Sequence, residues 1–528
     1  MSSPQNDNLR TRLEEFNTAI SEQQALLDKI TKTMVELQAD RRLIQSQLDS
    51  IVYPVHSLPL DVILEIFGHC ASESGPRILG GVPVVNSEHN FGHESYWSPT
   101  TIFRVCRSWR EIALATPTLW TTIDFRPRQD CPGHRVERYL EYRAIITRDL
   151  PLSVSINSDE IVRNLGRAAF ATLIRRAAPR LESLKLRVAA KGLFELDRYP
   201  PSFPLLRKLE IYFGDEDCMG PRVIERAFRH APLLRDVRTR SGPIHFPWTQ
   251  LKRFDGLFVE DAGCWHILTL AANLVEATFS PHTYEAPTDE LVPLRHSKIQ
   301  TFTLIGSRGC PKGYTSVLPL LTLPALQNLH LLEHTENDMD HILSFLPRHA
   351  GQLRTFRFSG RTELALTLKS LRPMLHLTDL TLELGSEPMP YIHEFIHELE
   401  DLKKAFLPQL RRISLLRCGY LMNSTDIEMI ARGLSTRWET PNNQLASFRL
   451  ELSRPYQSTD GTVAPEFPKI RPSLDLLTAL ARKGMHIYVG TRDTNYVWCN
   501  EMAVVVDLSN SDRNIQGELY RPIRRDWA

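Results

Sequence analysis

Apolar side chains recur at alternating intervals of three and four residues along the N-terminal part of the chain. Two interleaved rows with seven-residue spacing run through residues 9–51. One row is Leu13, Ile20, Leu27, Met34, Arg41 and Leu48, and the other is Leu9, Phe16, Gln23, Ile30, Leu37, Ile44 and Ile51. So narrow a stripe predicts a long helix that needs a partner helix. The partner is either a second copy, in a parallel dimeric coiled coil with Gln23 and Arg41 setting the register, or the rest of the same chain.

A second helical pattern follows Tyr53-Pro54, which ends the first because proline disfavours helical geometry in the preceding residue. It opens with Leu58-Pro59, and Asp61 lies in the first turn, where proline and a negative charge are both favoured. Its apolar residues lie on two faces: Leu60, Ile63, Leu64 and Phe67 on one, and Pro59, Val62, Ile66 and Cys70 on the other. One face can pack in a core, and the other needs a partner.

A third helix is expected after a long loop over residues 72–98, which is rich in Gly, Ser and polar residues. Ser98-Pro99 is a favourable helix start. Apolar residues then follow helical spacing: Ile102, Val105, Cys106, Trp109, Ile112 and Ala113. Thr116-Pro117 ends this helix, and Leu119-Trp120 follows directly.

These elements in this order resemble the F-box: an LP-led apolar helix, then VCRSWR at residues 105–110, then PTLW at 117–120. The resemblance implies a small all-α module that binds the adaptor of a cullin–RING ubiquitin ligase. The insertion at 72–98 means that residues 68–98 cannot be matched to the family pattern one by one. The residues that the resemblance places at or just behind the adaptor surface are Leu58, Pro59, Val62, Ile66, Phe67, Val105, Cys106, Trp109, Leu119 and Trp120.

A repeated LxxLxL pattern occupies the region after a helix predicted at Val136–Thr147 and a strand predicted at Leu152–Ile156. Nine copies begin at residues 181, 206, 274, 299, 326, 353, 377, 410 and 445, with weaker copies at Leu234 and Leu251. Amphipathic helices such as Ile342–Leu346 and Ile427–Leu434 lie between copies. The pattern is typical of a leucine-rich-repeat solenoid, in which neighbouring units bury each other's apolar side. A separate non-repeating α/β domain is the alternative.

In such a strand, leucines point to the core and the intervening side chains point to the open face. The target-binding candidates on that face are Lys185, Arg187, Lys208, Glu210, Tyr212, Asn328, His330, Arg357, Asp379, Glu383, Arg412, Arg449 and Glu451. Their mixed charge favours a protein partner.

Composition narrows the function classes. The 528 residues hold 63 Lys and Arg against 62 Asp and Glu, so no global field favours nucleic acid or an anionic membrane. The eight cysteines are never closer than 25 positions, which excludes CxxC pairs and fits reduced thiols in the cytoplasm or nucleus. We also expect no secretory signal and no membrane span.

His393-Glu394-Phe395-Ile396-His397 matches the HExxH motif of zinc peptidases. The apolar stripe of the same helix runs through Phe395, Ile396 and Leu399, so both histidines are expected to face solvent. Position 403, where one such pattern places its last histidine, is lysine, and Glu400 and Glu428 are only nominal third ligands. We interpret the match as chance and expect no metal, no cofactor and no catalytic residue.

The sequence therefore predicts an α+β multidomain protein: a long N-terminal helix, a small all-α F-box, then an α/β leucine-rich-repeat horseshoe. The predicted segments are a heptad helix (1–52), the F-box (53–125), a helix–strand bridge (126–160), the solenoid (161–490) and an unassigned tail (491–528). The predicted function is a non-catalytic substrate receptor of a ubiquitin ligase, with the adaptor, the cullin and an unknown target as partners. A repeat and coiled-coil scaffold outside any ligase is the alternative, and a zinc peptidase is a distant third.

Overall fold

The structure is a computed structural model, and two compact units, Met1–Cys70 and Ala71–Ala528, make up the chain. The residues that it describes are 4–50, 58–72, 78–79, 82–83, 102, 104–125, 133–157, 166–188, 192–213, 224–240, 244–259, 261–281, 292–306, 314–334, 338–360, 370–383, 390–400, 406–418, 424–440, 443–452, 467–491, 494–495 and 497. Most of the unassigned tail from 491 lies outside them.

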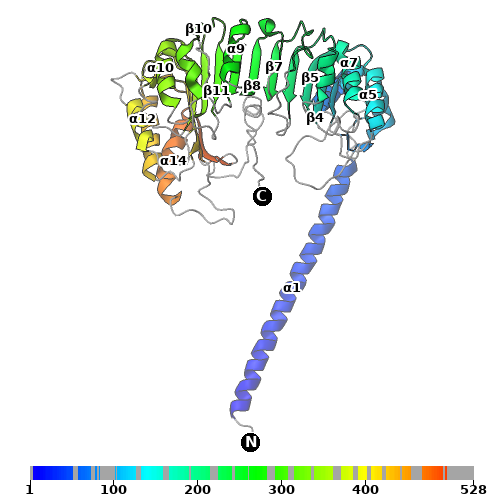
Figure 1. The fold of residues 1–528 in the computed structure, drawn as a ribbon. Helices are drawn as coiled ribbons and strands as arrows, with labels where there is room; N and C mark the ends of the chain where they lie inside the picture. The colour runs from blue at the N-terminus through cyan, green and yellow to red at the C-terminus, as the bar shows by residue number, and fades with distance from the viewer. Residues whose placement is uncertain are drawn as a thin grey trace. The chain divides into compact units, whose positions relative to one another are not determined.

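The first unit contains the predicted long helix. Helix α1 runs without interruption from Pro4 to Ser50, a length of about 70 Å at 1.5 Å per residue (Figure 1). Helix α2, Leu60–Ser72, begins directly after Leu58-Pro59, and the amide of Ile63 donates to the carbonyl of Pro59 at 3.1 Å. The two predicted helices are therefore both present.

The second unit contains a 15-stranded sheet whose strands follow chain order, apart from the separate two-stranded pair β10 (Leu294–Arg295) and β12 (Leu321–Thr322). Fourteen of the fifteen strands pair in parallel, and only the short β19, Thr494–Asn495, is antiparallel to its neighbour. The parallel strands are β3 (Thr122–Phe125), β4 (Leu152–Asn157), β5 (Leu181–Arg187), β6 (Lys208–Tyr212), β7 (Asp236–Arg240), β8 (Arg253–Val259), β9 (Glu276–Pro281), β11 (Thr301–Ile305), β13 (Asn328–His334), β14 (Thr355–Gly360), β15 (Asp379–Glu383), β16 (Arg412–Cys418), β17 (Ser447–Leu452) and β18 (His486–Thr491).

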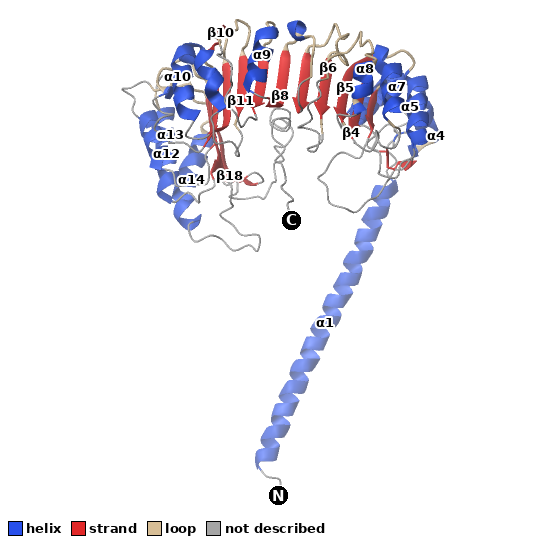
Figure 2. Ribbon diagram, in the orientation of Figure 1, coloured by secondary structure: helices blue, strands red, loops and turns tan. Residues whose placement is uncertain are grey.

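The helices of this unit lie along the outer side of the curved sheet, most of them toward its two ends, and the strands line its inner side (Figure 2). The helices of this unit are α4 (Arg107–Ala115), α5 (Gly133–Thr147), α7 (Arg167–Ala177), α8 (Phe194–Arg198), α9 (Asp261–Leu270), α10 (Met339–His349), α12 (Pro390–Glu400), α13 (Ser424–Trp438) and α14 (Phe467–Arg482). Shorter 3-10 turns complete the connections: η2 (Pro117–Trp120), η3 (Ala178–Arg180), η6 (Trp248–Gln250), η7 (Tyr314–Leu320) and η9 (Ala350–Gln352). An antiparallel pair, β1 (Ile78–Leu79) and β2 (Val82–Pro83), lies within the predicted 72–98 loop.

The repeats are in phase across the sheet. Leu184 pairs with Leu209 between β5 and β6, and Leu329 pairs with Phe356 between β13 and β14. These residues are 0–1% exposed, because they point between the sheet and the helices that cover it. Each predicted copy of the pattern, including the weak copies at Leu234 and Leu251, forms one strand of this sheet. The result is an α/β protein with a long parallel sheet, consistent with the predicted solenoid.

The sheet extends beyond the first and the last LxxLxL copy. Strand β3 lies at the end of the predicted F-box segment 53–125, which was expected to be all-α, and it pairs with β4 of the predicted bridge 126–160, which pairs with β5. At the other end β18, near the end of the predicted solenoid 161–490, pairs with β17. These strands carry alternating but less leucine-rich patterns, such as Val154 and Ile156, which a search for LxxLxL does not detect.

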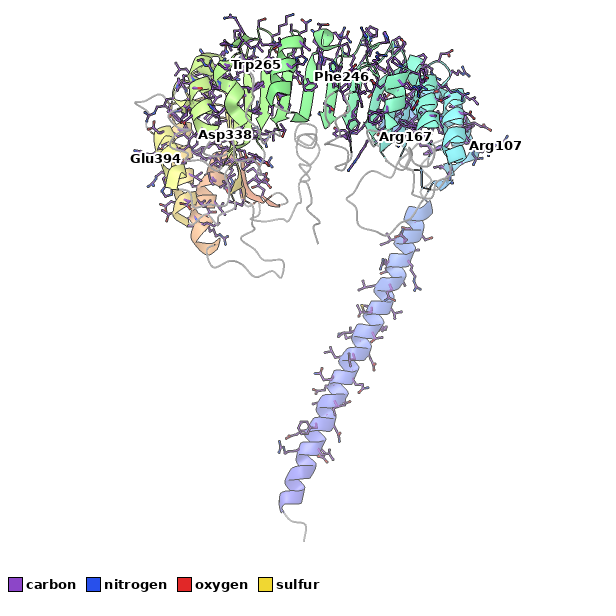
Figure 3. All side chains as sticks on the ribbon, viewed as in Figure 1. Arg107, Arg167, Phe246, Trp265, Asp338 and Glu394 are labelled. Carbon is purple, nitrogen blue, oxygen red and sulfur yellow. The ribbon has the colours of Figure 1, made fainter. Side chains whose placement is uncertain are left out.

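Aromatic side chains support the weak repeats in the middle of the sheet. At the third apolar position of the LxxLxL pattern, which faces the core, β7 has Thr239 and β8 has Gly256 in place of the usual large apolar residue. A row of rings lies here with successive centroids 5.3–6.2 Å apart, and Figure 3 labels one of them, Phe246. Its members are Phe203, Phe228, Phe246, Trp248, Phe254, Phe279 and Phe302. The packed rings therefore bury apolar surface where Thr239 and Gly256 are too small to do so.

Candidate functional site

Helix α2, here called the LP helix, presents apolar side chains to solvent on one face. Leu58, Val62 and Ile66 are 37%, 40% and 42% exposed, whereas Ile63 and Phe67 are 5% and 1% exposed. Pro59, in the first turn, is also exposed. The spacing of three and four residues separates the two faces. Leu60 is the exception, because the sequence groups it with Ile63 and Phe67 but it is 57% exposed. Of the five LP-helix candidates, four are accessible and Phe67 is interior.

The second group of predicted adaptor residues surrounds α4 and η2. Cys106 caps α4, and its Sγ accepts a hydrogen bond from the amide of Trp109 at 3.4 Å. Val105 is 54% exposed, and Cys106 and Trp109 are half-buried. Arg107, which Figure 3 labels, pairs with Glu111 at 2.9 Å on the solvent side of the helix.

Leu119 and Trp120 are buried at 5% and 2% exposure. The indole of Trp120 donates to the carbonyl of Ala113 at 2.7 Å, and the guanidinium of Arg143 lies 5.0 Å from the ring centroid. A second guanidinium nitrogen of Arg143 donates to the carbonyl of Thr122 at 2.5 Å. Trp120 therefore packs between α4 and α5, and Arg143 joins this contact to the first strand, β3. Trp120 is thus an interior residue and not part of an exposed surface.

All thirteen predicted target-binding residues lie on the side of the sheet opposite the helices, here called the strand face. The ladders align them in three rows, and the central row contains Lys185, Glu210, His330, Arg357 and Arg449. The other two rows hold Arg187, Tyr212, Glu383 and Glu451, and Lys208, Asn328, Asp379 and Arg412. Glu383 is buried at 6% exposure, and the others are half-buried or exposed.

The N-terminal part of the strand face is a chain of opposite charges. Lys185 Nζ lies 2.8 Å from Glu210 Oε2, and Arg238 Nε lies 2.9 Å from Asp255 Oδ2. Arg238 Nη1 also lies 4.0 Å from Glu210 Oε1, which joins the two pairs. Burial raises the pKa of Asp255, and the attraction of Arg238 opposes that shift. Burial, and then the Glu210 charge, raises the pKa of Tyr212 to about 12.

Arg238 and Asp255 are functional candidates that sequence reasoning missed. Both lie on the central row, because β7 and β8 pair in register with β6. Their repeats begin at the weak copies Leu234 and Leu251, which lack a large residue at the second inner position. The stronger copies of the pattern could have identified them. In each copy, the residue between the second and third apolar positions of LxxLxL lies on the strand face.

The charge pairs in the C-terminal part of the strand face share no residue with one another: they are Arg357 with Glu383, Arg412 with Asp379, and Arg449 with Glu451. Burial, and then the neighbouring Arg357 charge, lowers the pKa of His330 to about 4, so this imidazole is neutral at neutral pH. Arg357 Nη2 lies 3.7 Å from Glu383 Oε2.

Farther along, Arg449 pairs with Glu451 at 2.8 Å, and its guanidinium lies 5.0 Å from the ring centroid of Tyr488. Tyr488 is another residue that the sequence missed, because β18 lies outside the leucine pattern. The central row thus carries guanidinium groups, a tyrosine ring and a neutral imidazole.

The HExxH helix has the geometry that its pattern predicts. Phe395, Ile396 and Leu399 of α12 are 0–2% exposed, whereas the side chains of His393 and His397 are 47% and 80% exposed. His393 Nε2 is 2.7 Å from Asp426 Oδ1, and Glu394, labelled in Figure 3, is exposed. Among the described residues, no group of three or more His, Cys, Asp or Glu side chains is placed to hold a metal ion.

The chain matches no protein-family model, and a comparison with curated proteins finds no match. In the part of the chain that the structure describes, no helix is both long and apolar enough to cross a bilayer.

Proposed function

We propose that this protein is the substrate-receptor subunit of a cullin–RING ubiquitin ligase, with an F-box that binds the ligase adaptor and a leucine-rich-repeat horseshoe that binds the target. The observation that carries the proposal is an LP helix with an exposed apolar face, in a chain that continues into fourteen parallel strands with one open polar face. The F-box resemblance supplies the identity of the first partner.

The exposed residues of the LP helix have the chemistry of an adaptor contact. Burying a large apolar side chain contributes roughly 1.5–3 kcal/mol, so Leu58, Val62 and Ile66 together supply several kcal/mol toward association. Phe67, Leu119 and Trp120 have a different task in this proposal. They are interior residues that hold the contact side chains in position.

The strand face has the chemistry of a protein-binding surface. Its central row combines arginines, a tyrosine and alternating charges, and Arg and Tyr are enriched where protein interfaces gain most of their binding energy. Alternating charge also gives specificity, because a partner with the wrong pattern meets like charges. The target is therefore a protein segment with complementary alternating charge.

No catalytic group is required of a receptor. Its contribution is proximity: one end binds the ligase, the other binds the target, and a stiff repeat array holds a target lysine at high effective concentration near the ubiquitin donor. Tethering thus accounts for the activity without the HExxH histidines.

A second candidate function is an interaction scaffold outside any ligase. The observation that favours it is α1, a 47-residue helix whose apolar stripe is exposed. Adaptor binding without cullin recruitment would support this scaffold over the receptor.

The test is capture of the full-length chain by the ligase adaptor and cullin. We expect wild-type protein to retain both and a Val62→Asp/Ile66→Asp variant to lose both, because two charges would replace the apolar contact. The matched control is Ile145→Asp/Val292→Asp, which makes the same change at positions 75% and 72% exposed outside the F-box pattern.

Circular dichroism and the unfolding midpoint establish that each variant is folded. Well-folded wild-type protein that captures no adaptor overturns the receptor proposal. Equal loss of adaptor in the control variant would show that added charge, rather than the LP helix, is responsible.

A further inference from the structure

The two core rows of α1 remain exposed in the folded chain. Eight side chains of these rows are between 51% and 62% exposed. They are Leu13, Phe16, Ile20, Leu27, Ile30, Met34, Leu37 and Ile44. A surface stripe that contributed only solubility would carry polar residues at these positions, so the stripe requires a partner of matching length.

The stripe provides enough area for a stable interface between two copies. Full burial of a large apolar side chain removes roughly 60–120 Å² from water. For eight side chains on each of two helices the interface amounts to roughly 1,000–1,900 Å², the range of specific protein–protein interfaces.

The positions that flank the stripe allow two copies to approach without repulsion. On one side they are Arg10 near the N-terminal end and then uncharged polar residues: Asn17, Gln24, Thr31, Gln38 and Gln45. On the other they are mostly neutral: Ala19, Leu26, Thr33 and Gln47, with Arg12 and Asp40. Most charges lie on the outer face, at Glu14, Glu15, Glu22, Asp28, Lys29, Lys32, Glu36 and Arg42. Charge at the flanking positions sets partner choice in coiled coils, so these flanks are compatible with a second copy.

The two polar residues of the stripe determine the orientation. In a parallel pair each layer contains the same residue twice, so Arg41 meets Arg41 of the second copy in the interior. In an antiparallel pair that aligns Leu27 with Leu37, Gln23 meets Arg41 instead. The remaining layers of that register are apolar on both sides, including Ile20 with Ile44 and Ile30 with Met34. A buried guanidinium opposite an amide oxygen costs less than two opposed guanidiniums.

We propose that α1 binds a second copy of this chain as an antiparallel two-stranded coiled coil, with Gln23 of each copy opposite Arg41 of the other. The orientation differs from the parallel pair that is one of the two alternatives given by the heptads. The pair is symmetric, so each Gln23–Arg41 layer occurs twice. This proposal does not rest on the ubiquitin-ligase function, because adaptor binding and self-association are measured separately.

Light scattering on the full-length chain tests self-association. We expect twice the monomer mass for wild type and the monomer mass for Leu37→Asp/Ile44→Asp, whose side chains are 60% and 56% exposed. The matched control is Val35→Asp/Leu43→Asp, at 61% and 60% exposure on the outer face of the same helix, which we expect to remain dimeric. A monomeric wild type, or an assembly of three or more chains, overturns the proposal.

Thiol crosslinking tests the orientation. A short thiol-specific crosslinker should join Leu27→Cys chains to Leu37→Cys chains when the two are mixed, but should join neither variant to itself above the wild-type background. Crosslinking of each variant alone indicates a parallel pair and overturns the antiparallel proposal.

A single charge gives an independent test of the polar layer. Gln23→Glu places a carboxylate opposite Arg41 in the antiparallel pair, and two such ion pairs should tighten the dimer by roughly tenfold. In a parallel pair the same change opposes two carboxylates and weakens the dimer. Unchanged affinity would also overturn the proposed layer.

Discussion

Helix α1 and the strands of the sheet carry the same types of apolar residue, but these residues are exposed in α1 and buried in the strands. Leu27 in α1 is 62% exposed, whereas Leu329 in β13 is fully buried. The repeats lie side by side, so each unit covers the next within one chain. A stripe on a single helix has no neighbouring unit to cover it, and its burial has to come from another helix. Repetition therefore stabilises a fold in the sheet, whereas in α1 it leaves an apolar stripe exposed.

The largest expected change in unfolding free energy follows the loss of a large side chain from the core of the sheet. Phe356→Ala removes a fully buried ring from β14, and we expect the free energy of unfolding of the sheet to fall by about 3–5 kcal/mol. Leu27→Ala in α1 should change it by less than about 0.5 kcal/mol. Denaturant unfolding followed by circular dichroism measures both, and equal losses would show that α1 and the sheet unfold as one unit.

The next largest effect on stability is expected at Gly306, where the backbone of Glu333 comes close to the position that a Cβ would occupy. A Cβ at this position would clash with the carbonyl oxygen of Glu333, which lies in the left-handed region with φ 57° at a bulge of β13. We expect Gly306→Ala to cost about 1–3 kcal/mol in unfolding free energy, because backbone atoms have to move. Gly351→Ala is the control, since a Cβ there meets nothing within 4 Å. Similar unfolding midpoints for the two variants would contradict this packing.

Two histidines with lowered pKa values make the sheet sensitive to acid. The pKa of His330 is lowered to about 4 by burial and by Arg357, and burial also lowers the pKa of His349. His349 Nε2 accepts from the Leu323 amide at 2.9 Å, so its proton is on Nδ1, 3.0 Å from the Phe345 carbonyl.

The unfolded chain therefore binds protons below about pH 6.5 that the folded chain does not bind, and stability falls between about pH 6.5 and 4. For His330 the shift corresponds to a loss of up to about 3 kcal/mol. Unfolding midpoints of wild type and His330→Gln measured across this range test the expectation. If His330→Gln leaves the slope unchanged, His330 is not responsible.

The smallest effect belongs to the exposed ion pairs of the strand face. Lys185 pairs with Glu210 at 2.8 Å, but the lysine side chain is 47% exposed. Lys185→Ala should change the unfolding free energy by less than about 1 kcal/mol, and this difference should vanish in 1 M salt because the Debye length is then about 3 Å. Denaturant titrations at low and high salt measure it. A salt-independent loss would mean that Lys185 contributes by packing rather than by charge.

Much of the local structure could be predicted from the sequence. The helix over α1, the proline-led start of α2, the strands at the LxxLxL copies and the two faces of α12 all follow from spacing. Each of these depends on neighbours within about four residues, and the period alone distinguishes a helix from a strand. The thirteen strand-face candidates follow from the same alternation.

Other features could not be predicted because they depend on register between distant segments. Arg238 and Asp255 belong to the charge chain of the strand face only because β7 and β8 pair in phase with β6. The repeat pattern is weakest at these strands, and an aromatic row replaces the missing leucines. The contact between Arg143 and Trp120 is of the same kind, since it joins two segments of unrelated pattern.

By itself the sequence determined the elements, their order and the face that each presents, because the side-chain period is a local property. Only the tertiary structure decided that β3 and β4 belong to the same sheet as the repeats, and that Trp120 is interior. The physical reason is that burial and ion pairing depend on which segments lie side by side, and that choice is made by the free energy of the whole fold.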